Sequence, residues 1–196
     1  MKWAVVLGRL ALAAVTLCSV AAHADADAGR QKAQVCQSCH GEGGNSTQPM
    51  FPVLAGQPKQ FLVSALFQFR EGKRTSPVMS PLAADLTNKD LNDLADYFSA
   101  QKPRAPAGKT PPERVAQGRE IAQRNNCTAC HTATLTGQQH IPRLAGQHRE
   151  YLAAQLAAFK ASTRGELDGV MTSAAQGLSP ADIEVLSDYL STLTAP

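Results

Sequence analysis

The sequence predicts an all-α protein built from two tandem helical domains. The second half of the chain repeats the first at an offset of 90 to 92 positions, and a repeat of this length indicates two copies of one structural unit. Within each copy the apolar residues recur at helical spacing, as expected of amphipathic helices that cover a shared core. Two helical units of about 80 residues each are therefore expected.

Matching blocks define the repeat. The segment 52–57 (Pro-Val-Leu-Ala-Gly-Gln) matches 142–147 (Pro-Arg-Leu-Ala-Gly-Gln) at an offset of 90. A later series matches at an offset of 92: Met79, Leu86, Leu91, Leu94 and Tyr97 against Met171, Leu178, Ile183, Leu186 and Tyr189. The expected division of the chain is a signal peptide over 1–24, domain 1 over 25–102, a linker rich in proline over 103–112 and domain 2 over 113–196.

The first 24 residues are typical of a secretory signal peptide. Lys2 and Arg9 precede an apolar run over 10–22, and Ala24 completes a small-residue cleavage site. We expect cleavage after Ala24 and export, whereas an uncleaved leader would tether the protein to the membrane. Cys18 leaves with the leader, so the mature chain keeps four cysteines and 17 basic against 16 acidic residues. This balance excludes the basic stripe of a nucleic-acid-binding protein, and no nucleic-acid partner is expected.

Three helical stretches are predicted in order along each half. The first begins near Gly29 or Gly118, and the second follows Gln57-Pro58 or Gln147, where Pro58 suits a first helical turn. Gly72 suits the end of the second helix in domain 1. The last begins after a capping hydroxyl, with an acidic residue three positions later: Thr87 with Asp90, and Ser179 with Asp182.

The pentapeptide Cys-x-x-Cys-His occurs once in each half. It comprises Cys36, Cys39 and His40 in domain 1, and Cys127, Cys130 and His131 in domain 2. On a helix these three side chains share one face, so the thiols can bond the edge of a porphyrin while the imidazole reaches its iron. A zinc site or a redox dithiol is the alternative, but zinc needs four ligands that close on one metal. The motif therefore indicates two covalently attached haem c groups.

Methionines occupy equivalent positions downstream of the two motifs. Met79 lies 39 residues after His40, and Met171 lies 40 residues after His131. A thioether as the second axial ligand closes the haem iron to small oxidants and raises its reduction potential. We therefore expect His40 and Met79 on one iron and His131 and Met171 on the other. A methionine in this position can also be core filler.

Other histidines and one further methionine are expected to lie outside these sites. Met50 stands only ten residues from His40. His140 and His148 have no matching histidine in the first half, and exposed or locally bonded side chains are the simpler expectation. An iron-ligating histidine needs its other ring nitrogen held, usually by a backbone carbonyl. The carbonyls of Pro52 and Pro142 are predicted to do this, with Leu54 and Leu144 packing on the porphyrins.

These residues resemble class I cytochrome c, whose pattern is Cys-x-x-Cys-His, then Pro-x-Leu-x-Gly, then an axial methionine before an aromatic-bearing terminal helix. The tandem arrangement is similar to the dihaem cytochrome c4 family over essentially the whole mature chain. The resemblance implies two all-helical cytochrome c domains, each wrapped around a covalent haem, that are related by approximate twofold symmetry and have haem propionates near their interface.

The resemblance also implies a function. It suggests an electron carrier of the bacterial periplasm, possible peripheral membrane association, a membrane-bound donor such as a quinol-oxidising complex and an acceptor such as a terminal oxidase. Catalysis on a substrate is not expected. Two alternatives remain: the cytochrome subunit of a flavocytochrome-type sulfide dehydrogenase or other respiratory complex, and a dihaem peroxidase or thiosulfate-oxidising cytochrome.

The two halves differ in two places. The segment 132–139 lacks the glycine run that follows His40, and the approach to Met171 is longer than the approach to Met79. We expect the second haem to differ from the first in exposure and in potential.

Overall fold

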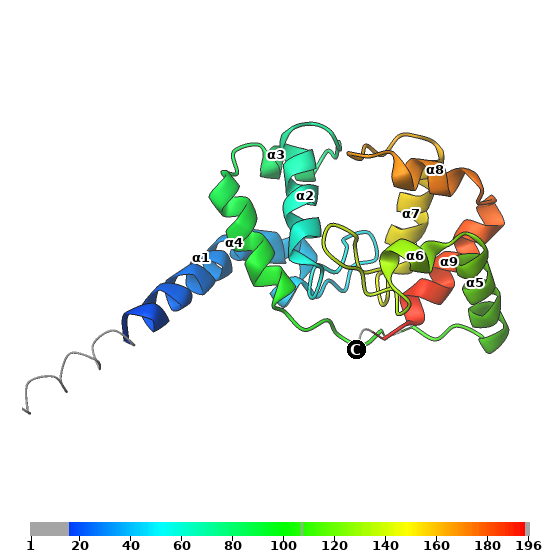
Figure 1. Ribbon diagram of the computed structural model, residues 1–196, viewed down its shortest axis with the longest axis horizontal. Helices are drawn as coiled ribbons and strands as arrows, with labels where there is room; N and C mark the ends of the chain where they lie inside the picture. Colours follow the sequence, from blue (N-terminus) through cyan, green and yellow to red (C-terminus); the bar gives the residue numbers. More distant parts are fainter. Residues whose placement is uncertain (1–15, 107, 195–196) are drawn as a thin grey trace, which may run out of the picture.

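The computed structural model describes residues 16–106 and 108–194, so positions 1–15 of the predicted signal peptide lie outside it. The described residues form helices joined by loops, with one isolated β-bridge between Gln138 and Ile141. This confirms the all-α expectation. Figure 1 shows two helical bodies side by side, with the segment before α5 running beneath them.

Each body contains the same succession of helices. Domain 1 contains α1 (Thr16–His40), which begins inside the predicted leader, the 3₁₀ turn η1 (Glu42–Gly44), α2 (Lys59–Arg70), α3 (Met79–Ala83) and α4 (Asn88–Ser99). Domain 2 consists of α5 (Pro112–Arg124), α6 (Cys127–His131), α7 (Arg149–Lys160), α8 (Val170–Gln176) and α9 (Pro180–Thr192). In domain 1 the terminal helix α4 packs on α1 and α2, and in domain 2 α9 packs on α5 and α7. Each short helix, α3 or α8, packs on the helix before it.

Each domain has its own apolar core. The domain 1 core centres on Ala33, Leu62, Leu94, Ala95 and Phe98. The domain 2 core includes Leu135, Leu152, Ile183, Leu186, Tyr189 and Leu190. These residues come mainly from the terminal helix, from the helix that crosses it and from α2 or α7. Burial of these side chains is the main stabilising contribution to such helices.

The glycines expected near the first helix starts have a different role. α1 begins at Thr16 and α5 begins at Pro112, so the predicted starts near Gly29 and Gly118 are both wrong. Gly118 lies where α5 meets α9, and a Cβ there would come within 2.2 Å of the Tyr189 Cβ. Gly29 occupies the equivalent crossing in domain 1, where a Cβ would lie 2.4 Å from the Asp93 carbonyl oxygen. The glycines permit close approach of two helices rather than starting one.

The start signals of the terminal helices are confirmed. The Thr87 hydroxyl accepts a hydrogen bond from the Asp90 amide, and the Asp90 carboxylate accepts one from the Thr87 amide at 2.9 Å. Ser179 and Asp182 form the same reciprocal pair in domain 2, again at 2.9 Å. Both capping boxes satisfy amide groups that the first helical turn leaves unpaired.

The linker is extended and attached to the body at its ends. The Asn45 side chain donates to the Lys102 carbonyl at 3.1 Å and accepts from the Arg104 amide at 2.8 Å. Near the other end, the Thr110 hydroxyl donates to the Asp188 carbonyl at 3.2 Å. In the part of the chain that the structure describes, no helix has the length and apolar character needed to cross a bilayer.

Candidate haem sites

The Cys-x-x-Cys-His pentapeptides lie on helices in both domains, but the chain before the pentapeptide differs between the domains. In domain 1 the motif forms the last turns of the continuous helix α1. In domain 2 a break separates α5 from α6, and Asn126 in this break has the left-handed φ of 55°. This break accounts for the two-residue shift of the repeat between Gly118 and Cys127. The motif keeps its helical form because the extra residues are absorbed before it.

None of the four motif cysteines forms a disulfide. Cys36 and Cys127 pack against the cores of their domains, and burial raises the pKa of both thiols. The second cysteines, Cys39 and Cys130, are half-buried and exposed. Within the described residues, no three His, Cys, Asp or Glu side chains gather into a metal-ion site. Each domain therefore presents its two thiols along a helix rather than around a common centre.

The two motif histidines are buried and held in the same way. His40 and His131 are each 5% exposed, and their Nδ1 atoms lie 2.9 Å from the Pro52 carbonyl and 2.8 Å from the Pro142 carbonyl. The predicted carbonyl contacts are therefore present. Because a carbonyl can only accept, Nδ1 must carry the proton, which leaves the lone pair of Nε2 free for a metal. Burial lowers the pKa of both rings and favours this neutral form.

Both candidate methionines lie at the start of a short helix. Met79 is the first residue of α3, and its amide donates to the Ser76 hydroxyl at 3.1 Å. Met171 is the second residue of α8, and its amide donates to the Glu166 carboxylate at 2.9 Å. Both side chains are half-buried, whereas Met50 is 59% exposed. The placement of Met79 and Met171 is equivalent, although ligation by their sulfur atoms remains a prediction.

The surroundings of the motifs suit a flat apolar group bonded to the cysteines. Cys36, Leu54 and Leu66 border the domain 1 core, and their counterparts Cys127, Leu144 and Leu156 border the domain 2 core. Leu54 and Leu144 are half-buried and come directly after the segments that hold the histidines. The residues present therefore fit a covalently bonded haem in each domain, with the histidine Nε2 available to the iron.

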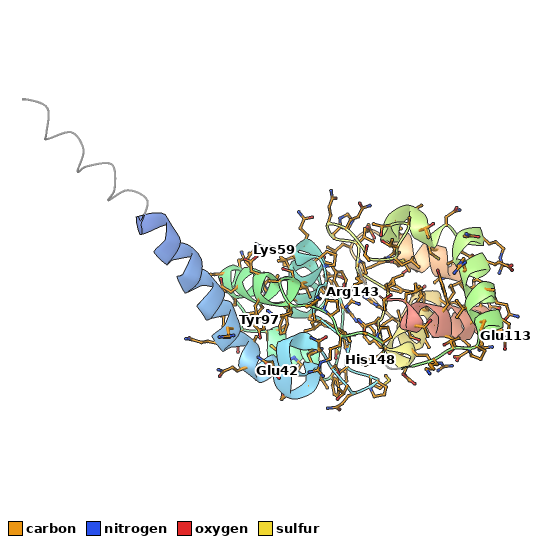
Figure 2. The ribbon with its side chains drawn as sticks, turned by 90° about the horizontal axis from the view of Figure 1, so that it is seen from below. Glu42, Lys59, Tyr97, Glu113, Arg143 and His148 are labelled. Atoms are coloured by element: carbon orange, nitrogen blue, oxygen red, sulfur yellow. The ribbon has the colours of Figure 1, made fainter. Side chains whose placement is uncertain are left out.

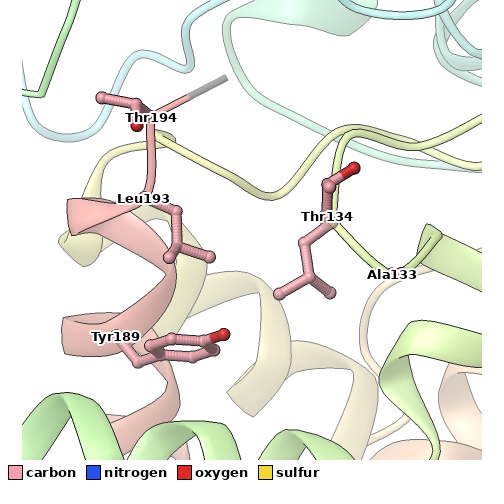
Figure 3. A pocket seen from close by; sticks show the side chains of 6 residues that line it. Ala133, Thr134, Tyr189, Leu193 and Thr194 are labelled. Carbon is pink, nitrogen blue, oxygen red and sulfur yellow. The ribbon is translucent and has the colours of Figure 1, made fainter. Parts of the chain in front are cut away.

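A separate surface hollow of about 330 Å³ lies in domain 2. Figure 3 shows it between the turn after α6, at Ala133 and Thr134, and the end of α9, at Tyr189 and Leu193. Neither His131 nor Met171 lines this hollow.

Some residues at the domain interface were missed by the sequence analysis. Gln57, Gln147 and Arg143 stand in the repeated block, yet only their position in the tertiary structure shows what they contact. His148 differs from the expectation of an exposed or locally bonded side chain, because its Nε2 lies 3.0 Å from the Ser46 carbonyl of domain 1. Figure 2 shows Arg143 and His148 between the two bodies. His140 is exposed, as expected.

The paired motifs, the held histidines and the helical fold define a c-type cytochrome with two domains. Matching families are described as Cytochrome c over residues 115–194 and as Cytochrome C oxidase, cbb3-type, subunit III over residues 24–98. Cytochrome c4 of Pseudomonas aeruginosa is 40% identical, covering 86% of this chain and 90% of its own. The reduced cytochrome c4 structure from Pseudomonas stutzeri superposes with a TM-score of 0.80 at 34% identity, covering 86% of this chain and 98% of its own.

The chain belongs to the cytochrome c4 family, and it is a dihaem electron carrier rather than an enzyme. Because cytochrome c4 is a dihaem family, membership implies two haem c groups, one for each domain. The chain is also similar to a thiosulfate dehydrogenase electron acceptor from Thiomonas intermedia, with 33% identity covering 93% of this chain and 90% of that protein. Because cytochrome c4 is an electron carrier, the alternative of a dihaem peroxidase or thiosulfate-oxidising cytochrome is not supported.

Proposed function

We propose that this cytochrome carries electrons in the bacterial periplasm, from a membrane-bound quinol-oxidising complex to a terminal oxidase, through two irons ligated by histidine and methionine. One observation carries the proposal: each domain holds a buried histidine with Nε2 free, and each places a methionine at the start of a short helix packed on α2 or α7. A haem so ligated supplies reversible ferrous to ferric cycling without an open coordination position.

The chain's own residues have separate roles in this proposal. Cys36 and Cys39, or Cys127 and Cys130, anchor the porphyrin through thioether bonds. The Pro52 and Pro142 carbonyls hold the ring planes of His40 and His131 and keep their protons on Nδ1. Ser76 and Glu166 hold the first turns from which Met79 and Met171 extend. The leader over 1–24 directs export, with maturation at Asp25.

Substitution of the methionines tests the ligand assignment. Met79→Ala and Met171→Ala should each lower the reduction potential of the haem in the same domain and open its iron to cyanide or carbon monoxide. Met50→Ala is the matched control, because this side chain is exposed and should leave ligand binding unchanged. If neither site variant binds added ligand more readily than the parent, the methionine assignment is wrong.

A second candidate function is service to one particular enzyme. The similarity to the thiosulfate dehydrogenase electron acceptor of Thiomonas intermedia favours a role as a dedicated acceptor or as the cytochrome subunit of a respiratory complex, including a flavocytochrome-type sulfide dehydrogenase. Purification from the native membrane and periplasmic fractions discriminates these roles. A free carrier should elute alone and be oxidised by membranes that contain terminal oxidase. A subunit should elute at fixed stoichiometry with a flavin-containing or thiosulfate-oxidising chain.

A further inference from the structure

Two glutamine side chains make matching contacts across the domain interface. Gln57 of domain 1 accepts from the Arg143 amide and donates to the Arg143 carbonyl, both at 2.9 Å. Gln147 of domain 2 accepts from the Val53 amide at 2.8 Å and donates to the Val53 carbonyl at 3.0 Å. Both side chains are at least 96% buried. Each amide therefore pairs with the backbone of one residue in the opposite domain, as a neighbouring β-strand would.

The paired residues directly follow the prolines that hold the histidines. The peptide group between Pro52 and Val53 accepts from His40 Nδ1 through its carbonyl, and it donates to Gln147 through its N–H. The peptide group between Pro142 and Arg143 likewise accepts from His131 and donates to Gln57. A continuous chain of hydrogen bonds therefore runs from each histidine, through one peptide group, to a side chain of the other domain.

Hydrogen bonds in such a chain strengthen one another, because each bond polarises the next group. A glutamine oxygen that accepts from the peptide N–H makes the carbonyl of the same peptide a stronger acceptor. The stronger acceptor pulls on the histidine Nδ1 proton and makes Nε2 a better electron donor. A better donor stabilises ferric iron, so the glutamine of one domain lowers the reduction potential in the other.

We propose that Gln57 and Gln147 are cross-domain positioning residues. Gln57 strengthens the hydrogen bond that His131 Nδ1 donates to its backbone carbonyl, and Gln147 strengthens the equivalent bond of His40. The inference rests on the proposed function, in which these histidines are the iron ligands. One repeated block supplies both halves of each contact, since Pro-x-Leu-Ala-Gly-Gln contains the carbonyl that holds the histidine and the glutamine that reaches the partner block. Self-complementarity of this kind is the property of a twofold interface.

Isosteric substitution tests the inference in the holoprotein. Gln57→Met and Gln147→Met remove the amide while keeping its approximate volume. Gln57→Met should raise the midpoint potential of the domain 2 haem and shift the ¹H and ¹⁵N resonances of the His131 Nδ1–H in the reduced protein upfield. Gln147→Met should do the same to the domain 1 haem and to His40. In each variant the histidine of the substituted domain should shift much less.

Tyr151→Phe is the matched control. It removes the hydroxyl that accepts from Arg74 at 3.0 Å across the same interface, yet it touches neither peptide group of the two chains. It should leave both histidine resonances in place. If the glutamine variants shift both histidines equally, shift only the histidine of their own domain, or behave like Tyr151→Phe, the glutamines only dock the domains and the inference is wrong.

Failure of the proposed function would be seen separately. The parent protein alone shows whether His40 and His131 have the large ring-proton shifts of iron-bound imidazole. Parent spectra without those shifts would overturn the ligand assignment before any variant is compared. If the parent spectra show those shifts but the glutamine variants have no cross-domain effect, the ligand assignment stands and only the proposed role of Gln57 and Gln147 is overturned.

Discussion

The turn that follows the motif histidine has two left-handed positions in both domains, but different residues occupy them. In domain 1 it uses Gly41 and Gly44, with φ of 73° and 77°; in domain 2 Thr132 and Leu135 hold φ of 73° and 59°. The Gly44 carbonyl accepts from the amides of residues 54 and 55, and the Leu135 carbonyl accepts from those of residues 144 and 145. Because a non-glycine residue costs about 1–2 kcal/mol in this left-handed region, domain 2 needs a compensating contribution.

Side-chain volume supplies that compensation. A Cβ on Gly44 would lie 2.8 Å from the Phe98 ring, so the large aromatic of α4 requires glycine in the turn. The equivalent of Phe98 in domain 2 is the smaller Leu190, and Leu135 packs into the same core cluster with only 1% of its surface exposed. The two domains therefore keep the left-handed position at Gly44 and Leu135 and exchange the side chain that fills the space beside it.

A second difference concerns charge. The position after the histidine-holding proline is Val53 in domain 1 and Arg143 in domain 2. The Arg143 guanidinium is buried and donates to the carbonyls of Ala55 and Ala145, which are equivalent residues of the two domains. Burial lowers the Arg143 pKa to about 10, so the side chain stays charged at neutral pH. Arg143 thus places a buried cation at a position where the repeat alone would suggest an apolar residue.

Among the substitutions that test this exchange of side-chain volume, Leu135→Ala should destabilise the protein most. Truncation of a buried leucine costs about 2–5 kcal/mol, and the strained φ is not relieved because alanine also avoids this region. Denaturant unfolding of the oxidised holoprotein measures the loss. Gly44→Ala should cost about 1–3 kcal/mol through overpacking, and Phe98→Leu should recover part of that cost. If the destabilisations of Gly44→Ala and Phe98→Leu simply add in the double variant, the proposed exchange of side-chain volume is contradicted.

Alanine at the helix crossings should come next and should affect both domains alike. Gly29→Ala and Gly118→Ala each place a Cβ within 2.4 Å of a neighbouring atom, and we expect about 1–3 kcal/mol of destabilisation from each. Gly108→Ala is the control, since a Cβ there meets nothing within 4 Å. Thermal unfolding monitored by circular dichroism checks the comparison. A neutral Gly118→Ala would show that the two crossings are not equivalent.

Removal of the buried Arg143 cation should lower the potentials of both haems. A buried positive charge favours the ferrous state, which has one positive charge fewer than the ferric state. At an effective dielectric constant near 20, a unit charge acts over about 10 Å with roughly 1.5 kcal/mol. Spectroelectrochemical titration of Arg143→Met should therefore show a downward shift of this order or less, while Val53→Met should leave the potentials nearly unchanged. An upward shift in Arg143→Met would contradict the assignment of this role.

Loss of a capping box should cause the smallest destabilisation, and its size should be nearly the same in the two domains. Thr87→Ala and Ser179→Ala should each cost about 1 kcal/mol at neutral pH. The Ser179 hydroxyl and amide lower the Asp182 pKa below its usual range, so this contribution is complete above about pH 4 and is lost as the pH falls through the lowered value. Unfolding of Ser179→Ala should accordingly approach that of the parent in acid. A cost that grows on acidification would contradict this account.

Local patterns predicted much of the candidate site before any tertiary information. The motif cysteines and histidines, the repeated methionines and the capping pairs are recognisable because their partners lie a few residues away or recur at the same place in a repeat. The predicted start near Gly118 was wrong because the residue that explains this glycine lies far from it in the sequence. A glycine that allows close helix packing cannot be told from one at a helix boundary without knowing that Tyr189 lies opposite.

By itself, the sequence determined the helical class, the twofold repeat, the attachment motif and the carbonyls that hold its histidines. Only the tertiary structure decided that Gln57 and Gln147 reach the opposite domain, that Leu135 replaces the volume of Phe98, and that Arg143 is buried between equivalent carbonyls. The reason is physical. Helix caps and motif geometry follow from covalent spacing along the chain, whereas the contacts of a buried amide or cation depend on residues about 90 positions away, which only folding brings within hydrogen-bonding distance.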